Sequence, residues 1–161
     1  ALNAGQFPLS VVALSPRGAT WYRHGIYGNT MTGNPRACEV ATAVLNSMTP
    51  TLRQNIREMG VYFLEKYSAL MDEIPEIIRV NGTGLLFQVK IDEAIPVTAM
   101  DGIERILRMR GINVIHGGTN ALRFTPNFDI TREEADMQIE HVRDILLEKR
   151  ASLHSVPRHK L

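Results

Sequence analysis

Apolar side chains recur every three or four positions from Leu52 to Met71, which predicts a long amphipathic helix with one stripe facing a core. Thr49-Pro50 is typical of a helix start, and Pro75 should end the helix. The predicted core stripe consists of Leu52, Ile56, Met59, Phe63, Tyr67, Leu70 and Met71.

After Pro75 the pattern alternates between short apolar runs and helical periods, which predicts a compact α/β unit. Asn81-Gly82-Thr83-Gly84 should be the turn between the first two strands, and His116 to Asn120 a second turn. The strands are expected at Ile77–Val80, Leu85–Ile91, Ile112–Ile115 and Ala121–Phe124.

Two further helices are expected in this half. Thr98 and Asp101 resemble a capping pair for a helix that ends at Gly111. Thr131-Arg132-Glu133-Glu134 is a capping box that opens the last helix, whose inward positions are Ile139, Val142 and Leu146. Residues 151–161 are polar and aperiodic, which predicts a flexible tail.

The first third of the chain is expected to hold one buried strand, Leu9–Leu14, and then a long loop with a short helix around Ala19–Arg23. Asn34 should cap a helix from Pro35 to about Met48. One strand and one helix bury too little surface to fold alone. We therefore expect residues 1–48 to be an incomplete part of a larger domain, and residues 49–150 to be a second, smaller domain. The absence of an initiator methionine fits a piece of a longer protein.

Charge and composition exclude several classes of function. With 18 basic and 17 acidic residues the net charge is +1, so neither a nucleic-acid partner nor a membrane surface is indicated. No apolar run approaches the roughly 20 residues that span a bilayer, and no signal peptide opens the chain. A single cysteine, Cys38, excludes an internal disulfide and fits a reducing, cytoplasmic location. The histidines show no metal-ligand spacing, so no metal site is expected.

Two segments contain candidate binding residues. In Tyr27 to Pro35, the Thr30 hydroxyl and nearby backbone N–H groups could hold a phosphate-sized anion, although the segment could equally be a turn without a ligand. In Ala121 to Pro126, Arg123 stands in an otherwise apolar strand, where it could bind a carboxylate in two-point fashion or form a structural salt bridge. His116 could line a pocket or simply be solvated, and Cys38 is expected to be a small core thiol.

Three motifs in this order resemble those of class III, pyridoxal-phosphate-dependent aminotransferases. Residues 27–35 resemble that family's Gly-Ser-Thr-Phe/Tyr-Gly-Gly-Asn-Pro signature, with Asn29 in place of the common serine and Thr32 in place of a glycine. Residues 1–10 resemble the segment that follows the Schiff-base lysine, and residues 121–126 the strand that carries a carboxylate-binding arginine. Gly82-Thr83-Gly84-Leu85 resembles a family hairpin near the substrate entrance, although a plain tight turn explains it as well.

The resemblance implies a fold-type-I α/β protein, with the end of the large cofactor domain followed by the small C-terminal domain. It implies that Thr30 and Asn29 hold the phosphate of pyridoxal 5'-phosphate in the neighbouring subunit of a homodimer, and that Arg123 grips a substrate carboxylate. The implied reaction is amino transfer between an amine or ω-amino acid and a 2-oxo acid, such as 2-oxoglutarate, in the ornithine and acetylornithine subgroup.

The catalytic lysine would stand one position before Ala1, so this chain alone is expected to be inactive and to contain no catalytic residue. The alternative is a non-catalytic assembly or regulatory domain that keeps the shape of a transaminase.

Overall fold

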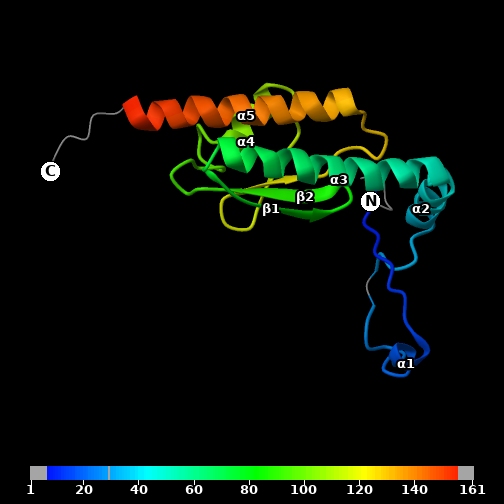
Figure 1. Ribbon diagram of the computed structural model, residues 1–161. Helices are drawn as coiled ribbons and strands as arrows, with labels where there is room; N and C mark the ends of the chain where they lie inside the picture. The colour runs from blue at the N-terminus through cyan, green and yellow to red at the C-terminus, as the bar shows by residue number, and fades with distance from the viewer. Residues whose placement is uncertain (1–6, 29, 156–161) are drawn as a thin grey trace. The chain divides into compact units, whose positions relative to one another are not determined.

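The computed structural model describes residues 7–28 and 30–155, and the chain divides into two compact units, residues 1–50 and 51–161 (Figure 1). No helix in these described stretches is both long and apolar enough to cross a membrane. The elements in chain order are α1 (Pro16–Ala19), α2 (Pro35–Ser47), α3 (Pro50–Glu73), β1 (Ile77–Thr83), β2 (Leu86–Ile91), α4 (Ile103–Met109), β3 (Ile115–Gly117), β4 (Ala121–Phe124) and α5 (Arg132–Ser155).

The first unit consists of α1, α2 and the loops around them. The prediction of a buried strand at Leu9–Leu14 is wrong, because these residues form no strand and Val12 is 77% exposed. A strand needs hydrogen-bonded partners, and the described part of this unit contains no other strand. The short helix lies earlier than Ala19–Arg23, at Pro16–Ala19, because the Ser15 hydroxyl caps it by accepting from Gly18 N at 3.1 Å.

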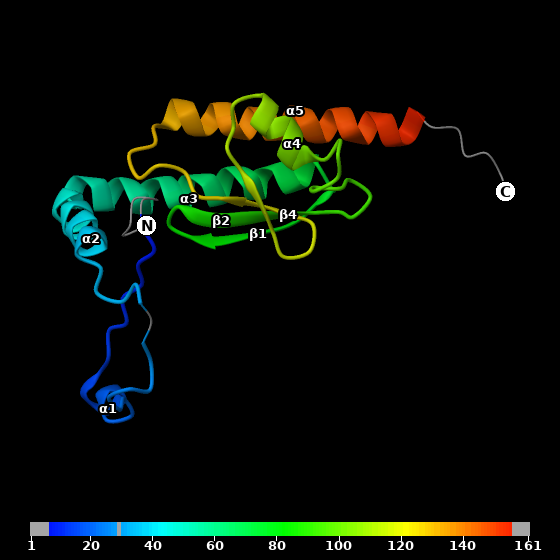
Figure 2. The same cartoon turned by 180° about the vertical axis from the view of Figure 1, so that it is seen from behind.

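The second unit is an antiparallel four-stranded sheet with the strand order β1-β2-β4-β3. Helices α3, α4 and α5 lie on one side of this sheet, as the two opposite views show (Figure 1, Figure 2). The predicted stripe of α3 supplies Met59, Phe63, Tyr67 and Leu70 to the buried core, and Ile139, Val142 and Leu146 of α5 are buried as expected. Among the described residues of this unit, no helix covers the other side of the sheet (Figure 1, Figure 2).

A stack of aromatic rings forms the centre of that core. The rings of Phe63 and Phe87 lie 4.7 Å apart, and those of Phe87 and Phe124 lie 5.1 Å apart, which joins α3, β2 and β4. Tyr67 is fully buried, and its hydroxyl accepts a hydrogen bond from Gln138 Nε2 at 3.2 Å. Burial raises the pKa of Tyr67, so this hydroxyl stays neutral.

The β1–β2 hairpin turns later than the sequence predicts. Strand β1 continues through Thr83, so the turn is Gly84-Leu85 and not the tetrad that starts at Asn81. Gly84 has a φ of +53°, which favours glycine. Helix α3 approaches this turn so closely that a Cβ on Gly60 would stand 2.6 Å from the Gly84 backbone. The close packing of α3 on the turn fixes where the hairpin reverses.

The last two helices differ in how well their starts were predicted. Thr98 and Asp101 do not cap α4; its N-cap is Gly102, with no side-chain hydrogen bond. The capping box of α5 is confirmed, because Thr131 Oγ1 accepts from Glu134 N at 3.2 Å and Glu134 Oε2 accepts from Thr131 N at 2.9 Å. Helix α5 extends through Ser155, beyond the expected start of a tail at residue 151.

Candidate functional site

The predicted anion-binding segment lies in the first unit, just before α2. Asn34 caps this helix as expected, since its Oδ1 accepts from Arg36 N at 3.0 Å and from Ala37 N at 3.4 Å. Cys38 N is bonded to Asn34 O, so these three N–H groups have partners inside the chain. The helix start therefore offers fewer free N–H groups than the sequence suggested, and an anion here would depend mainly on side chains.

Thr30 is exposed in the turn that precedes this cap, while Asn29 lies outside the described residues. An exposed hydroxyl can donate a hydrogen bond to a phosphate oxygen. Residues 1–50 include three arginines and a single acidic residue, Glu39, so the local charge favours an anion. Cys38 is exposed, which makes the expectation of a core thiol wrong for this chain.

Arg123 stands in the middle of β4, between the buried side chains of Leu122 and Phe124. Because side chains alternate across a strand, Arg123 points to the open side of the sheet, where it is exposed. The structural salt bridge considered as its alternative role is not observed: among the described residues, no carboxylate pairs with Arg123. Its guanidinium is therefore available to a carboxylate from outside this unit.

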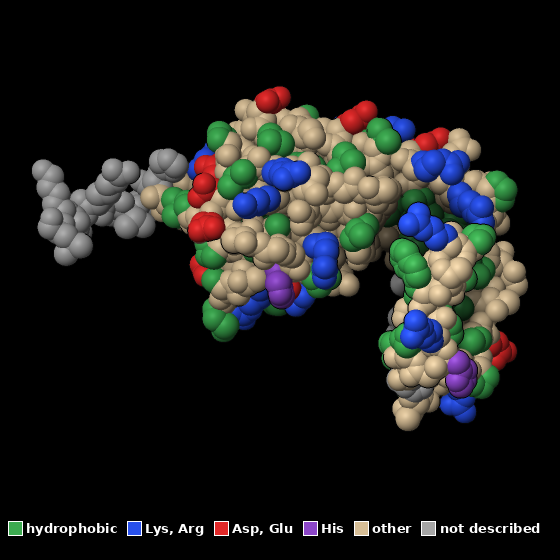
Figure 3. Space-filling model, turned by 90° about the horizontal axis from the view of Figure 1, so that it is seen from below, with side chains coloured by type: hydrophobic (Ala, Val, Ile, Leu, Met, Phe, Trp, Pro, Cys, Tyr) green, Lys and Arg blue, Asp and Glu red, His purple; other side chains and the backbone are tan. Residues whose placement is uncertain are grey.

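A shallow depression of about 500 Å³ adjoins Arg123 at the hairpin end of the sheet. In the register of the sheet, Arg123 lies opposite Gln88, which in turn lies opposite Asn81. Arg79 and Lys90 also face each other across β1 and β2, and no carboxylate pairs with them in the described part of the chain. In the view from below, Lys and Arg side chains stand on this unit while Asp and Glu gather towards its edge (Figure 3). The open face thus attracts anions.

The remaining candidates have structural roles in this unit. His116 is not merely solvated, because its Nδ1 lies 3.0 Å from Glu104 Oε2. Glu104 is itself buried and accepts a hydrogen bond from Arg108 Nη2. The side chains of His116 and Arg108 therefore both interact with the buried Glu104 carboxylate. Nowhere in the described residues do three His, Cys, Asp or Glu side chains gather in a way that could hold a metal ion.

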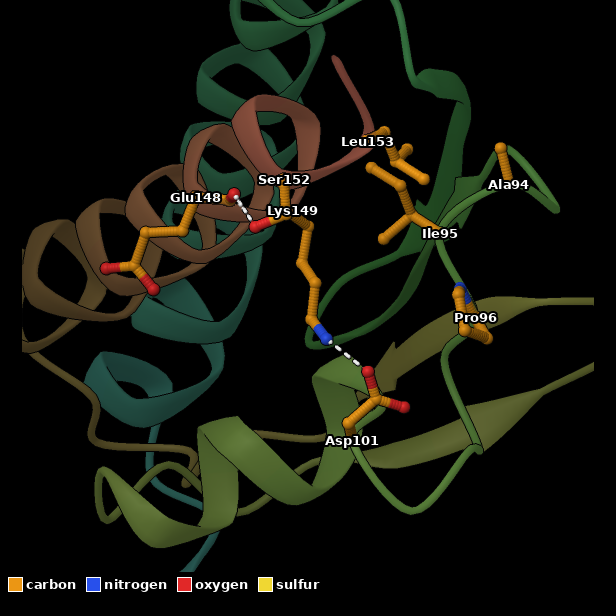
Figure 4. A pocket seen from close by; sticks show the side chains of 8 residues that line it. All are labelled: Ala94, Ile95, Pro96, Asp101, Glu148, Lys149, Ser152 and Leu153. Carbon is orange, nitrogen blue, oxygen red and sulfur yellow. Dashed lines mark hydrogen bonds and ion pairs between the residues drawn. The ribbon is translucent and has the colours of Figure 1, made fainter. Parts of the chain in front are cut away.

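A second pocket, of about 410 Å³, lies between the end of α5 and the loop before α4 (Figure 4). Its lysine, Lys149, donates to Asp101 Oδ2 at 2.8 Å, and this bond holds the pKa of the Asp101 carboxyl below its usual value. The Lys149 cation is thus already paired within the pocket, and no other cationic side chain is found among the described residues that line it.

Asn120 is an important residue that sequence reasoning missed. It has a φ of +50°, and its side-chain Nδ2 lies within hydrogen-bond distance of the carbonyl oxygens of Ile91, Asp92 and Ile95, which share its two N–H donors. Its Oδ1 accepts from Val97 N at 2.8 Å. These bonds fix the loop after β2 against the start of β4, the strand that carries Arg123. Its place in a Gly-Gly-Thr-Asn turn signalled only a change of direction.

Comparison with known proteins gives a consistent result. The family model described as "Aminotransferase class-III" matches residues 1–146. The ornithine aminotransferase of Geobacillus sp. is 33% identical over 90% of this chain, and the acetylornithine aminotransferase of Vibrio vulnificus is 30% identical over 82% of it. The matches cover 35% and 33% of those proteins, so the chain spans about a third of the length of these relatives.

Solved structures agree with the sequence matches. The ornithine aminotransferase of Plasmodium yoelii superposes with a TM-score of 0.78 at 26% identity, covering 92% of this chain and 39% of that one. The acetylornithine aminotransferase of Elizabethkingia anophelis superposes with a TM-score of 0.74 at 28% identity, covering 91% of this chain and 39% of that one. The expected α/β, fold-type-I class is thereby confirmed.

Proposed function

Because the chain belongs to the class III aminotransferases, a pyridoxal-phosphate-dependent family, we propose that it is the C-terminal part of an aminotransferase. Its reaction moves an amino group between an amine or ω-amino acid and a 2-oxo acid such as 2-oxoglutarate. The observation that carries this proposal is Arg123, an exposed guanidinium with no carboxylate partner among the described residues, on a cation-lined sheet face. A 2-oxo acid supplies the carboxylate that this group lacks.

Thr30 is the residue that would hold the cofactor phosphate, together with Asn29. Three features favour this assignment: the hydroxyl of Thr30 is exposed, the surrounding unit is basic, and the segment ends in the Asn34 cap that its motif requires. In the proposed homodimer, Thr30 reaches the cofactor of the partner subunit, so each active site is composite. The single cysteine of the chain fits a reducing cytoplasm.

Within this reaction the described residues of the chain hold the cofactor phosphate and orient the substrate. Pyridoxal phosphate, when bound, supplies the electron sink that makes the α-carbon of the substrate reactive. The planar guanidinium of Arg123 donates two hydrogen bonds to the substrate carboxylate, which sets the orientation of the amino or oxo group. The catalytic lysine and the groups that contact the cofactor ring belong, in this proposal, to the large domain.

Two substitutions in the full-length protein test these roles against each other. Arg123→Ala should raise the KM for 2-oxoglutarate by about 10- to 100-fold, the loss of a charge-assisted hydrogen-bond pair, and should leave the cofactor bound. Thr30→Ala should weaken cofactor retention during dialysis, followed by visible absorbance, with a smaller effect on KM for the 2-oxo acid.

Each variant serves as the control for the other. An unchanged KM in Arg123→Ala would rule out the carboxylate role, and equal retention in Thr30→Ala would rule out the phosphate role. A full-length protein without any cofactor absorbance would favour the non-catalytic assembly or regulatory domain instead.

A further inference from the structure

A row of polar side chains crosses the open side of the sheet beside Arg123. Asn81 on β1, Gln88 on β2 and Arg123 on β4 are paired in register across three neighbouring strands. Side chains directly opposite each other in an antiparallel sheet have Cβ atoms about 4.5–5.5 Å apart. All three line the same depression of about 500 Å³. Arg123 therefore shares its surroundings with two amide side chains.

The Gln88 amide has one end fixed and one end open. Its Nε2 donates to Asn81 Oδ1 at 3.0 Å, which sets the orientation of the amide. Its Oε1 is an acceptor for which no hydrogen-bond donor is found among the described residues. The amide is half-buried against the sheet, so its rotation is restricted. The Asn81–Gln88 pair thus aims a carbonyl oxygen along the row towards β4.

Gly117 on β3 leaves the space in which this oxygen and Arg123 meet. The position that a Gly117 Cβ would take is 3.7 Å from Gln88 Oε1, 3.7 Å from Arg123 Cδ and 3.3 Å from Arg123 Cβ. Oε1 and the arginine stem therefore border the same small gap. A side chain at position 117 would press on the arginine from one side and close that gap.

We propose that Gln88 is a positioning residue for Arg123: as the substrate carboxylate binds, Gln88 Oε1, held in place by Asn81, accepts a hydrogen bond from the guanidinium and orients its planar fork. Arginine loses much rotamer freedom when it is fixed, and an acceptor that is already held in place offsets part of that cost at the moment of binding. This inference rests on the proposed function of Arg123, and it adds a residue that favours substrates with a carboxylate in one orientation. A neutral amide suits the role, because a carboxylate at position 88 would occupy the guanidinium itself.

The first test is Gln88→Met in the full-length enzyme, which keeps the side-chain volume and removes the amide. The KM for 2-oxoglutarate should rise about 2- to 10-fold, because one orienting hydrogen bond is lost while the guanidinium still binds the carboxylate, and kcat should stay within experimental error. Gln54→Met is the matched control: Gln54 donates to Glu58 at 2.7 Å on the exposed side of α3, outside the depression. It should leave both constants unchanged.

The second test uses one substitution that adds a charge at position 88 and one that adds volume at position 117, beside Arg123. Gln88→Glu should raise this KM more than Gln88→Met does, because the new carboxylate competes with the substrate for Arg123, and added salt should narrow the difference. Gly117→Ala should also raise KM, since its methyl group presses on the Arg123 stem. The urea midpoint of each variant checks that the fold is intact.

The outcomes separate this inference from the proposed function. If Arg123→Ala raises KM while Gln88→Met and Gln88→Glu behave like the wild type, the positioning role is wrong and the carboxylate role of Arg123 stands. A fall in kcat at unchanged KM also overturns the inference. If Arg123→Ala has no effect, both fail together.

Discussion

The two compact units of this chain differ in where their apolar side chains lie. The described part of residues 51–161 buries a continuous core drawn from three helices and three strands, including the stacked rings of Phe63, Phe87 and Phe124. In the described part of residues 1–50, the buried apolar side chains are only those of Ala37 and Ala41, while Trp21 is 72% exposed. The second unit thus has a hydrophobic core of its own, whereas the described part of the first unit buries almost no apolar side chain.

This difference has a counterpart in the proposed site. Arg123, for which we propose carboxylate binding, stands on a sheet whose register and loops are held within its own unit, through the Asn120 side chain among others. Thr30, for which we propose phosphate binding, stands in a turn among exposed apolar side chains. We therefore expect the Arg123 half of the site to be formed in this chain alone, and the Thr30 half to be completed only in the full-length dimer.

The largest expected effect tests whether the free energy of unfolding of this chain comes mainly from the second unit. Phe63→Ala should lower the free energy of unfolding of this chain by about 3–5 kcal/mol, because it leaves a cavity in the ring stack. Trp21→Ala, an equally drastic truncation in the first unit, should change it by less than about 0.5 kcal/mol. Urea unfolding followed by circular dichroism measures both, and equal losses would contradict the comparison.

A pair of matched helix caps gives a smaller and sharper test. Thr131→Ala removes the cap of α5 and should cost about 0.5–2 kcal/mol in the same unfolding experiment. Asn34→Ala removes the cap of α2 in the first unit, and should leave the main unfolding transition where it is. A comparable shift from Asn34→Ala would mean that α2 unfolds together with the second unit, which would contradict the difference in stability between the two units.

Sequence-based prediction succeeded for features that depend on residues close together in the chain. The α3 stripe, β4 and the α5 capping box were predictable, because each depends on residues close together in the chain that pack within one unit. The strand at Leu9–Leu14 was not, since strand formation depends on partners and its apolar pattern says nothing about whether they are present. The Asn34 cap of α2 was predictable in the first unit for the same reason as the α5 capping box, since a helix cap depends only on residues close together in the chain.

The candidate site shows the same limit. Arg123 was found from its place in an apolar strand, yet its neighbours Gln88 and Asn81 were not, because they meet it only through the register of three strands. That register depends on the late turn at Gly84, which α3 fixes by close packing at Gly60. Neither the turn position nor this approach leaves a local signature in the sequence.

The smallest expected effect is on the stability of the fold at acidic pH. In the described residues, ion pairs occur in the second unit, among them Lys149 with Asp101 and Arg143 with Glu73. The hydrogen bond from Lys149 lowers the pKa of the Asp101 carboxyl in the folded state. A lowered pKa contributes stability that is fully present above the unfolded value of about 3.9 and is lost as the pH falls through the folded pKa.

Asp101→Asn should therefore lower the urea midpoint slightly at pH 7, and the difference from the wild type should vanish as the pH falls below about 4. Asp101 is largely exposed, so solvent screening keeps the effect small. Glu39→Gln in the first unit is the control: Glu39 forms no ion pair in the described residues, so the wild-type midpoint should be kept at every pH. A pH-dependent loss in Glu39→Gln would show that the acidic residue of the first unit also contributes to the cooperative fold.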